Sequence, residues 1–221
     1  MTLRTEEYRP EFFRTCVDIM GDTWNFNEYF PGLRISNLIN ELFFQSAIIG
    51  MNHREVIVDD SGNAHGYLFG KLPGEPGVPL QTARDNVRLA LRLLYHYLAG
   101  SFGDRKNARK IAIDLMQVES LLTGKKTPEH AYVGLFFVSS SLRGMGWGKR
   151  LMDRFENKAR YRDASAVYLW TDLGCNYGFY DHYGFTRVVE IASPLLSKFT
   201  GGINGFAYEK RLDGASFSQS V

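Results

Sequence analysis

The chain has very little cysteine. Cys16 and Cys175 are the only two among 221 residues, so a disulfide framework is excluded. Neither has the Cys/His spacing of a zinc site, and no metal is expected. No run of about 18 apolar residues is present, and the first residues lack the layout of a secretory signal peptide. We therefore expect a protein of the cytoplasm that does not bind membranes.

A strong charge of one sign is also missing. The formal net charge is +2, which gives no overall field to attract nucleic acid. Hydrophobic residues make up 44% and charged residues 23%, as in ordinary globular proteins. Internal repeats and low-complexity segments are absent. The length suits one domain over residues 1–221, with room for an insertion.

The segment from Ala131 to Glu156 holds the main functional signal. Residues 131–138 form an apolar run rich in aromatic and β-branched side chains, which predicts a buried strand. The turn Arg143-Gly-Met-Gly-Trp-Gly148 follows, and then an amphipathic helix. A glycine turn that opens a helix leaves backbone N–H groups unpaired at the positive end of the helix dipole. The segment therefore predicts an anion site that a phosphate can approach closely.

Two common phosphate motifs do not fit this turn. The glycines are spaced G-x-G-x-G, which departs from the dinucleotide fingerprint, and Arg150 stands where a P-loop needs Ser or Thr. The pattern Arg143-x-x-Gly146-x-Gly148, five residues after a strand that ends at Val138, instead resembles the pyrophosphate loop of the GCN5-related N-acetyltransferases (GNAT superfamily). The alternative is a turn whose glycines serve tight packing alone.

A second segment resembles the same family. Phe179-Tyr180…Gly184-Phe185 is similar to its second signature, a short helix that carries an aromatic pair and ends in Gly-Phe. The resemblance implies that Asn176 bonds the pantetheine arm. It also implies that the Tyr180 hydroxyl reaches the CoA sulfur, where it would donate a proton to the thiolate. The alternative for Tyr180 is a packing role on a short helix.

The rest of the chain is compatible with the family's α/β fold, a mixed central β-sheet flanked by helices and splayed around the cofactor. Expected strands are 2–5, 55–58, 65–69, 131–138, 166–172, 186–191 and 205–212, with helices 10–20 and 35–49. Residues 215–221 look like a frayed tail.

A helical insertion over about 71–128, before the CoA-binding strand, departs from the family pattern. It predicts helices 82–99 and 107–122, each with one apolar stripe to bury. The insertion would cover the acceptor site or form a homodimer interface. Arg84, Arg88 and Arg92 line one helix face. They form a solvated face, or a patch for an acidic acceptor, for the CoA 3′-phosphate or, in a rival interpretation, for nucleic acid.

The resemblance implies transfer of an acetyl group from acetyl-CoA to a primary amine, on a small molecule or a protein, whose identity the sequence leaves open. The rival is a non-catalytic acyl-CoA-binding sensor or scaffold. The implied catalytic residue is Tyr180, and the Val138 N–H would polarise the thioester carbonyl. The implied cofactor-binding residues are Phe136, Phe137, Val138, Arg143, Gly144, Met145, Gly146, Trp147, Gly148, Lys149, Asn176, Phe179 and Tyr180.

The general base is open. Glu129, His130 and Asp172 lie at strand ends, where surface or capping roles are the simpler interpretation, and a water chain would serve instead of a side chain. The aromatic loop 24–30 is a candidate wall of the acceptor pocket, or plain core packing.

Overall fold

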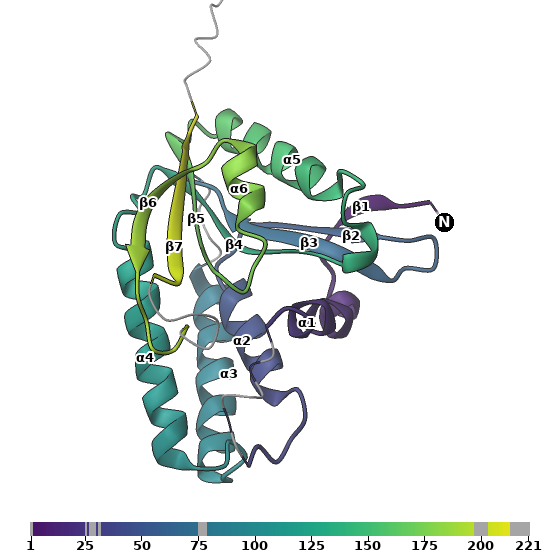
Figure 1. Cartoon of the computed structure of the whole chain (residues 1–221). Helices are drawn as coiled ribbons and strands as arrows, with labels where there is room; N and C mark the ends of the chain where they lie inside the picture. The colour runs from purple at the N-terminus through teal and green to yellow at the C-terminus, as the bar shows by residue number, and fades with distance from the viewer. Residues whose placement is uncertain are drawn as a thin grey trace, which may run out of the picture.

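A sheet of seven strands runs through the centre of the protein, with helices on both faces (Figure 1). The computed structural model describes residues 2–24, 26, 30, 32–74, 79–196 and 203–212, so the expected tail and Tyr29 lie outside the described residues. The strand order is β1-β2-β3-β4-β5-β7-β6, in which β4 and β5 run parallel and the other neighbours antiparallel. This is the mixed sheet that the sequence predicted.

The elements follow the predicted order. The strands are β1 (Arg4–Glu7), β2 (His53–Val58), β3 (Ala64–Lys71), β4 (His130–Val138), β5 (Ala166–Asp172), β6 (Thr186–Ile191) and β7 (Gly205–Arg211). The helices are η1 (Pro10–Phe12), α1 (Phe13–Gly21), α2 (Leu38–Ile48), α3 (Pro79–Leu98), α4 (Arg105–Thr123), η3 (Ser140–Leu142), α5 (Trp147–Tyr161) and α6 (Gly178–Tyr183). Helix α2 begins three residues later than expected, since Asn37 has a left-handed backbone with φ 62°.

Two cores cover the two faces of the sheet. Helix α5 buries Leu151, Met152 and Phe155 against β4 and β5 on one face. On the other face, α1 and α2 pack against β3, with Cys16 and Phe44 fully buried. The apolar spacing of α5 and α1 therefore marks the side of each helix that contacts the sheet.

Helices α3 and α4 form the insertion between β3 and β4, beside α2 (Figure 1). The apolar stripe of α4 is buried as predicted, because Val118 and Leu122 pack against Tyr168 of β5. The Tyr168 hydroxyl donates to the Leu122 carbonyl at 2.6 Å. Helix α3 packs on α2, where Arg92 bonds Gln45 at 2.7 Å and Glu41 at 2.5 Å.

The stripe of α3 is not buried within the chain. Val87, Leu91, Leu94 and Leu98 are between 53% and 62% exposed. The expectation that this stripe packs against the sheet is therefore wrong, and the reason is that another side of α3, with Leu89 and Arg92, makes the contacts with the rest of the chain. Burial in a second subunit is the alternative that remains.

The described residues contain neither a helix that could span a membrane nor a cluster that could hold a metal ion. Among the residues that the structure describes, none of the helices is both long and apolar enough to span a membrane. Over the same ranges, no cluster of three or more His, Cys, Asp or Glu side chains is arranged to hold a metal ion.

Candidate functional site

Strands β4 and β5 separate halfway along their length. The first pair is His130 with Ala166, and the last pair is Val133 with Leu169. Beyond that point β4 continues to Val138 beside β3 alone, and β5 continues to Asp172 beside β7 alone. A gap thus opens at the centre of the sheet, and it leaves peptide groups of β4 without a strand partner on that side.

A β-bulge at Gly134 accompanies the gap. Phe69 pairs with Leu135 and Gly70 with Val133, so Gly134 has no partner on β3. The extra residue reverses the alternation of side chains between the two faces of the sheet along β4. Before the bulge Val133 belongs to the core under α5; after it, Phe136 packs on that same side and Leu135 packs on the α1 side.

The register also decides where the peptide groups of β4 point. The Ser139 N–H donates to the His65 carbonyl at 2.8 Å. Residues of an antiparallel strand alternate in direction, so Phe137 also bonds β3. The N–H and C=O groups of Phe136 and Val138 are therefore directed away from β3 and into the gap.

The glycine turn lies at the open end of the gap. Gly144 and Gly146 have φ of +76° and +79°, the left-handed region in which side chains are strained. The first backbone bond into α5 runs from the Arg150 N–H to the Gly146 carbonyl at 3.0 Å. The N–H groups of residues 146–149 precede it, so they have no partner within the helix. Four donors and the positive end of the α5 dipole thus gather at one place.

Gly148 keeps this place open. A Cβ there would lie 3.4 Å from Cζ of Phe136 and 3.6 Å from Cε2 of Phe179, so a side chain would fill the space between β4 and α6. Two of the nearby cations are engaged, since Lys149 bonds Asp153 at 2.6 Å and Arg150 lies over the Trp147 ring. Arg143 is exposed and has no ion pair with any residue that the structure describes.

Helix α6 brings Tyr180 to the same gap. Its ring packs 5.5 Å from Phe179 and 5.4 Å from Tyr208, and its hydroxyl has no hydrogen bond to the described residues. Burial raises the pKa of Tyr180 well above its usual value, with smaller contributions from Cys175 and Tyr208. The hydroxyl therefore stays protonated at neutral pH. Asn176, at the start of the same segment, is exposed and its side chain is unbonded there.

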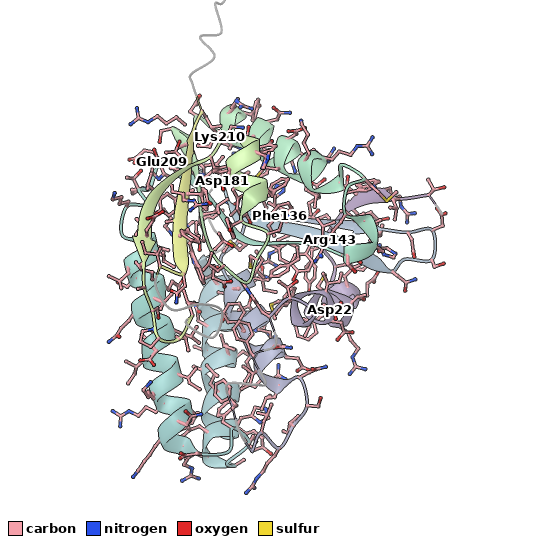
Figure 2. All side chains as sticks on the ribbon, viewed as in Figure 1. Asp22, Phe136, Arg143, Asp181, Glu209 and Lys210 are labelled. Carbon is pink, nitrogen blue, oxygen red and sulfur yellow. The ribbon has the colours of Figure 1, made fainter. Side chains whose placement is uncertain are left out.

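These residues line one cavity of about 770 Å³. Of the thirteen predicted cofactor-binding residues, only Met145 does not line it, and its side chain is 62% exposed. Figure 2 shows Phe136 and Arg143 between α5 and α1, and both line the cavity. The predicted residues were thus brought together from three separate segments of the chain.

The cavity passes through the gap to the α1 side of the sheet. There it is lined by Trp24 and Trp170, whose rings are stacked 6.4 Å apart, and Trp24 meets Phe137 edge-on at 5.0 Å. Within the loop 24–30, Trp24 lines the cavity, while Phe30 belongs to a core cluster with Phe102. Sequence analysis missed Trp170 and Cys175, because their exposure depends on where β5 leaves β4.

The three candidate bases lie in different places. Glu129 precedes β4, and His130 is in its first pair with β5, at the opposite end from the gap. Asp172 ends β5 beside the gap, is 3% exposed, and accepts from the Gly174 N–H at 2.7 Å. Burial raises the pKa of the Asp172 carboxyl, and it raises that of the Cys175 thiol to about 12. Only Asp172 is both near the cavity and a stronger base than usual.

Comparisons with known proteins agree with this geometry. The model of the acetyltransferase (GNAT) family matches residues 111–185, which include β4, the glycine turn, α5, β5 and α6. The chain therefore has the fold of the GNAT acetyltransferases, and its residues 111–185 match that family's model. No curated protein sequence matches the chain.

Solved structures share the fold at low sequence identity. A GCN5-related N-acetyltransferase from Kribbella flavida is 11% identical, with 95% of this chain and 98% of that chain covered and a TM-score of 0.55. A GNAT-family acetyltransferase from Staphylococcus aureus is 12% identical over 96% of this chain and 99% of that chain, with a TM-score of 0.52. A Pyrococcus horikoshii protein is 10% identical over 96% of this chain and 99% of that chain, with a TM-score of 0.59. Identities this low show the fold and no more.

Proposed function

We propose that this protein transfers an acetyl group from acetyl-CoA to a primary amine. The observation that carries the proposal is the single cavity in which the gap between β4 and β5 meets the glycine turn. The turn supplies donors for a pyrophosphate, and the gap supplies peptide groups for an extended pantetheine arm. The cavity continues past Tyr180 to Trp24 and Trp170, where an amine would approach from the other side of the sheet.

The chain would assist the reaction at two points, the oxyanion and the departing thiolate. The amine nitrogen attacks the thioester carbonyl carbon, and the carbonyl oxygen becomes an oxyanion. The Val138 N–H, which points into the gap, would donate to that oxygen. The C–S bond then breaks, the nitrogen loses a proton to water, and the thiolate leaves and takes a proton from solvent.

Tyr180 would act by hydrogen bonding more than by giving up its proton. A thiol has a pKa of about 8.5, so full transfer of a proton to the thiolate from a tyrosine with a raised pKa would be unfavourable. A donated hydrogen bond still stabilises the developing thiolate, and bonds to charged groups are worth about 1.5–3 kcal/mol. This refines the proton-donor role that the sequence implied.

A free-thiol assay across a panel of amines tests the proposal. Tyr180→Phe should lower kcat by about 10–100-fold with CoA affinity nearly unchanged. Tyr183→Phe is the matched control, because Tyr183 lies on the same helix but donates to Asp153 at 2.5 Å and does not line the cavity. Equal kcat in both variants would remove Tyr180 from the reaction. Tight CoA binding without turnover of any amine would favour the non-catalytic sensor.

A further inference from the structure

Helix α3 exposes an unusual number of large apolar side chains. Its less exposed side carries Thr82, Asp85, Arg92 and His96 together with Leu89, which packs against the cluster that includes Leu38 and Leu42. The exposed residues are Val87 (60%), Leu91 (61%), Leu94 (53%), Tyr95 (67%) and Leu98 (62%). At 100° per residue these five fall within an arc of about 100° around the helix. They form one stripe, which we call the α3 stripe.

The orientation of α3 is set by Leu89, which packs in the cluster with Leu38 and Leu42, and by the bonds of Arg92. Arg92 binds both Gln45 and Glu41 of α2, and rotating the helix to bury the α3 stripe would break both contacts. The stripe offers roughly 600 Å² of accessible surface, at the upper end of the largest apolar patch on a typical monomer. A surface of this kind is expected to be covered by a partner.

We propose that the α3 stripe binds the α3 stripe of a second copy of this chain, in an antiparallel helix pair about a two-fold axis at Leu91. The axis then brings Val87 of each copy opposite Tyr95 of the other, and Leu98 opposite Arg84. Such a contact is self-complementary, which a two-fold interface requires. With its flanking residues the stripe approaches the ~800 Å² per partner of a stable interface.

The charges favour the antiparallel arrangement. Arg84 and Arg88 are exposed beside the stripe, in the N-terminal half of α3. In a parallel pair each would face its own copy. In the antiparallel pair the two copies of Arg84 are about 21 Å apart along the axis. Each arginine then lies near Tyr95 and the negative helix end of the other copy, which attract cations.

Sedimentation equilibrium of the full chain tests the proposal. The wild type should have twice the mass of one chain, and Leu91→Asp should weaken dimerisation by about 100-fold or more, since two carboxylates would meet at the axis. Leu91 is exposed, so circular dichroism should show an intact fold. Tyr161→Asp, at an 83% exposed residue of α5 on the other face of the sheet, is the control and should remain dimeric. A monomeric wild type at 100 μM would overturn the proposal.

Disulfide trapping tests the register. Chains carrying Val87→Cys should crosslink to chains carrying Tyr95→Cys, and neither variant should crosslink to itself as readily. The wild type is the control for crosslinking through Cys16 and Cys175. Crosslinking of each variant only to itself would indicate a parallel pair and overturn the arrangement. The remaining alternative is that the α3 stripe binds a membrane surface, and flotation with phosphatidylserine vesicles tests it. If the monomer binds vesicles and Leu91→Asp does not, the stripe is assigned to a membrane surface instead.

Discussion

The anion site at the start of α5 can be tested by one pair of substitutions at Gly146. Gly146→Asp and Gly146→Asn add side chains of equal shape, and both residue types tolerate a left-handed backbone better than others. A Cβ at Gly146 would meet nothing within 4 Å, so neither side chain has to displace its surroundings. The pair therefore separates the effect of charge from the effect of volume.

Coulomb's law gives the order of magnitude of the charge effect. We take a separation of about 5 Å between a carboxylate at position 146 and a pyrophosphate bound by the N–H groups of residues 146–149. Two phosphate charges at that distance, with an effective dielectric constant between about 20 and 80, repel it by about 2–7 kcal/mol. The loss of CoA affinity in Gly146→Asp should thus be at least about 20-fold, and much smaller in Gly146→Asn.

Calorimetry with CoA and with 3′-dephospho-CoA measures this difference. Both ligands should show it, because both have the pyrophosphate, and it should shrink in 0.5 M salt as screening increases. Gly62→Asp is the control for backbone strain, since Gly62 has φ +82° with nothing within 4 Å and lies in the β2–β3 turn. Gly62→Asp should lower the free energy of unfolding by a similar amount, about 1 kcal/mol, without lowering the affinity for CoA. Equal CoA affinity in the Asp and Asn variants of Gly146 would refute the site.

Two further substitutions test the sheet around the gap. Asp172→Asn keeps an oxygen that can accept from the Gly174 N–H. Because the folded state raises the pKa of Asp172, its ionised form opposes folding, so the variant should melt at a higher temperature than the wild type at pH 7.5. This gain in melting temperature should fade as the pH drops below the folded pKa towards 3.8. An equal gain at pH 7.5 and pH 3.5 would contradict this, and loss of turnover in a stable Asp172→Asn variant would identify the base. Gly70→Ala should cost about 1–3 kcal/mol in thermal unfolding, because its Cβ would lie 2.6 Å from the backbone oxygen of Tyr132; an unchanged melting temperature would show that β3 and β4 can move apart there.

The sequence predicted the parts of the site that depend on local pattern. A strand, a glycine turn and an amphipathic helix are each specified by neighbouring residues, and so is the position of Tyr180 on a short helix that ends at Gly184. Their convergence on one cavity was predicted only through the family resemblance. The gap that joins them depends on how far β4 pairs with β5, which no single segment determines. The glycine within the apolar run 131–138 was a usable signal, since glycine inside a strand often marks a bulge.

The α3 stripe shows a second limit of periodicity. The spacing of Val87, Leu91, Leu94 and Leu98 predicts a helix with one apolar side, and that helix is present. The pattern cannot say which surface covers that side, because the position of α3 depends on the contacts of Leu89 and Arg92 with α2, about fifty residues away in sequence. An apolar side normally faces the core because burial removes it from water. Here the side with Leu89 and Arg92 makes contacts within the chain, whereas the α3 stripe stays exposed in the part of the chain that the structure describes, so the same hydrophobic argument that failed for the single chain favours assembly of two.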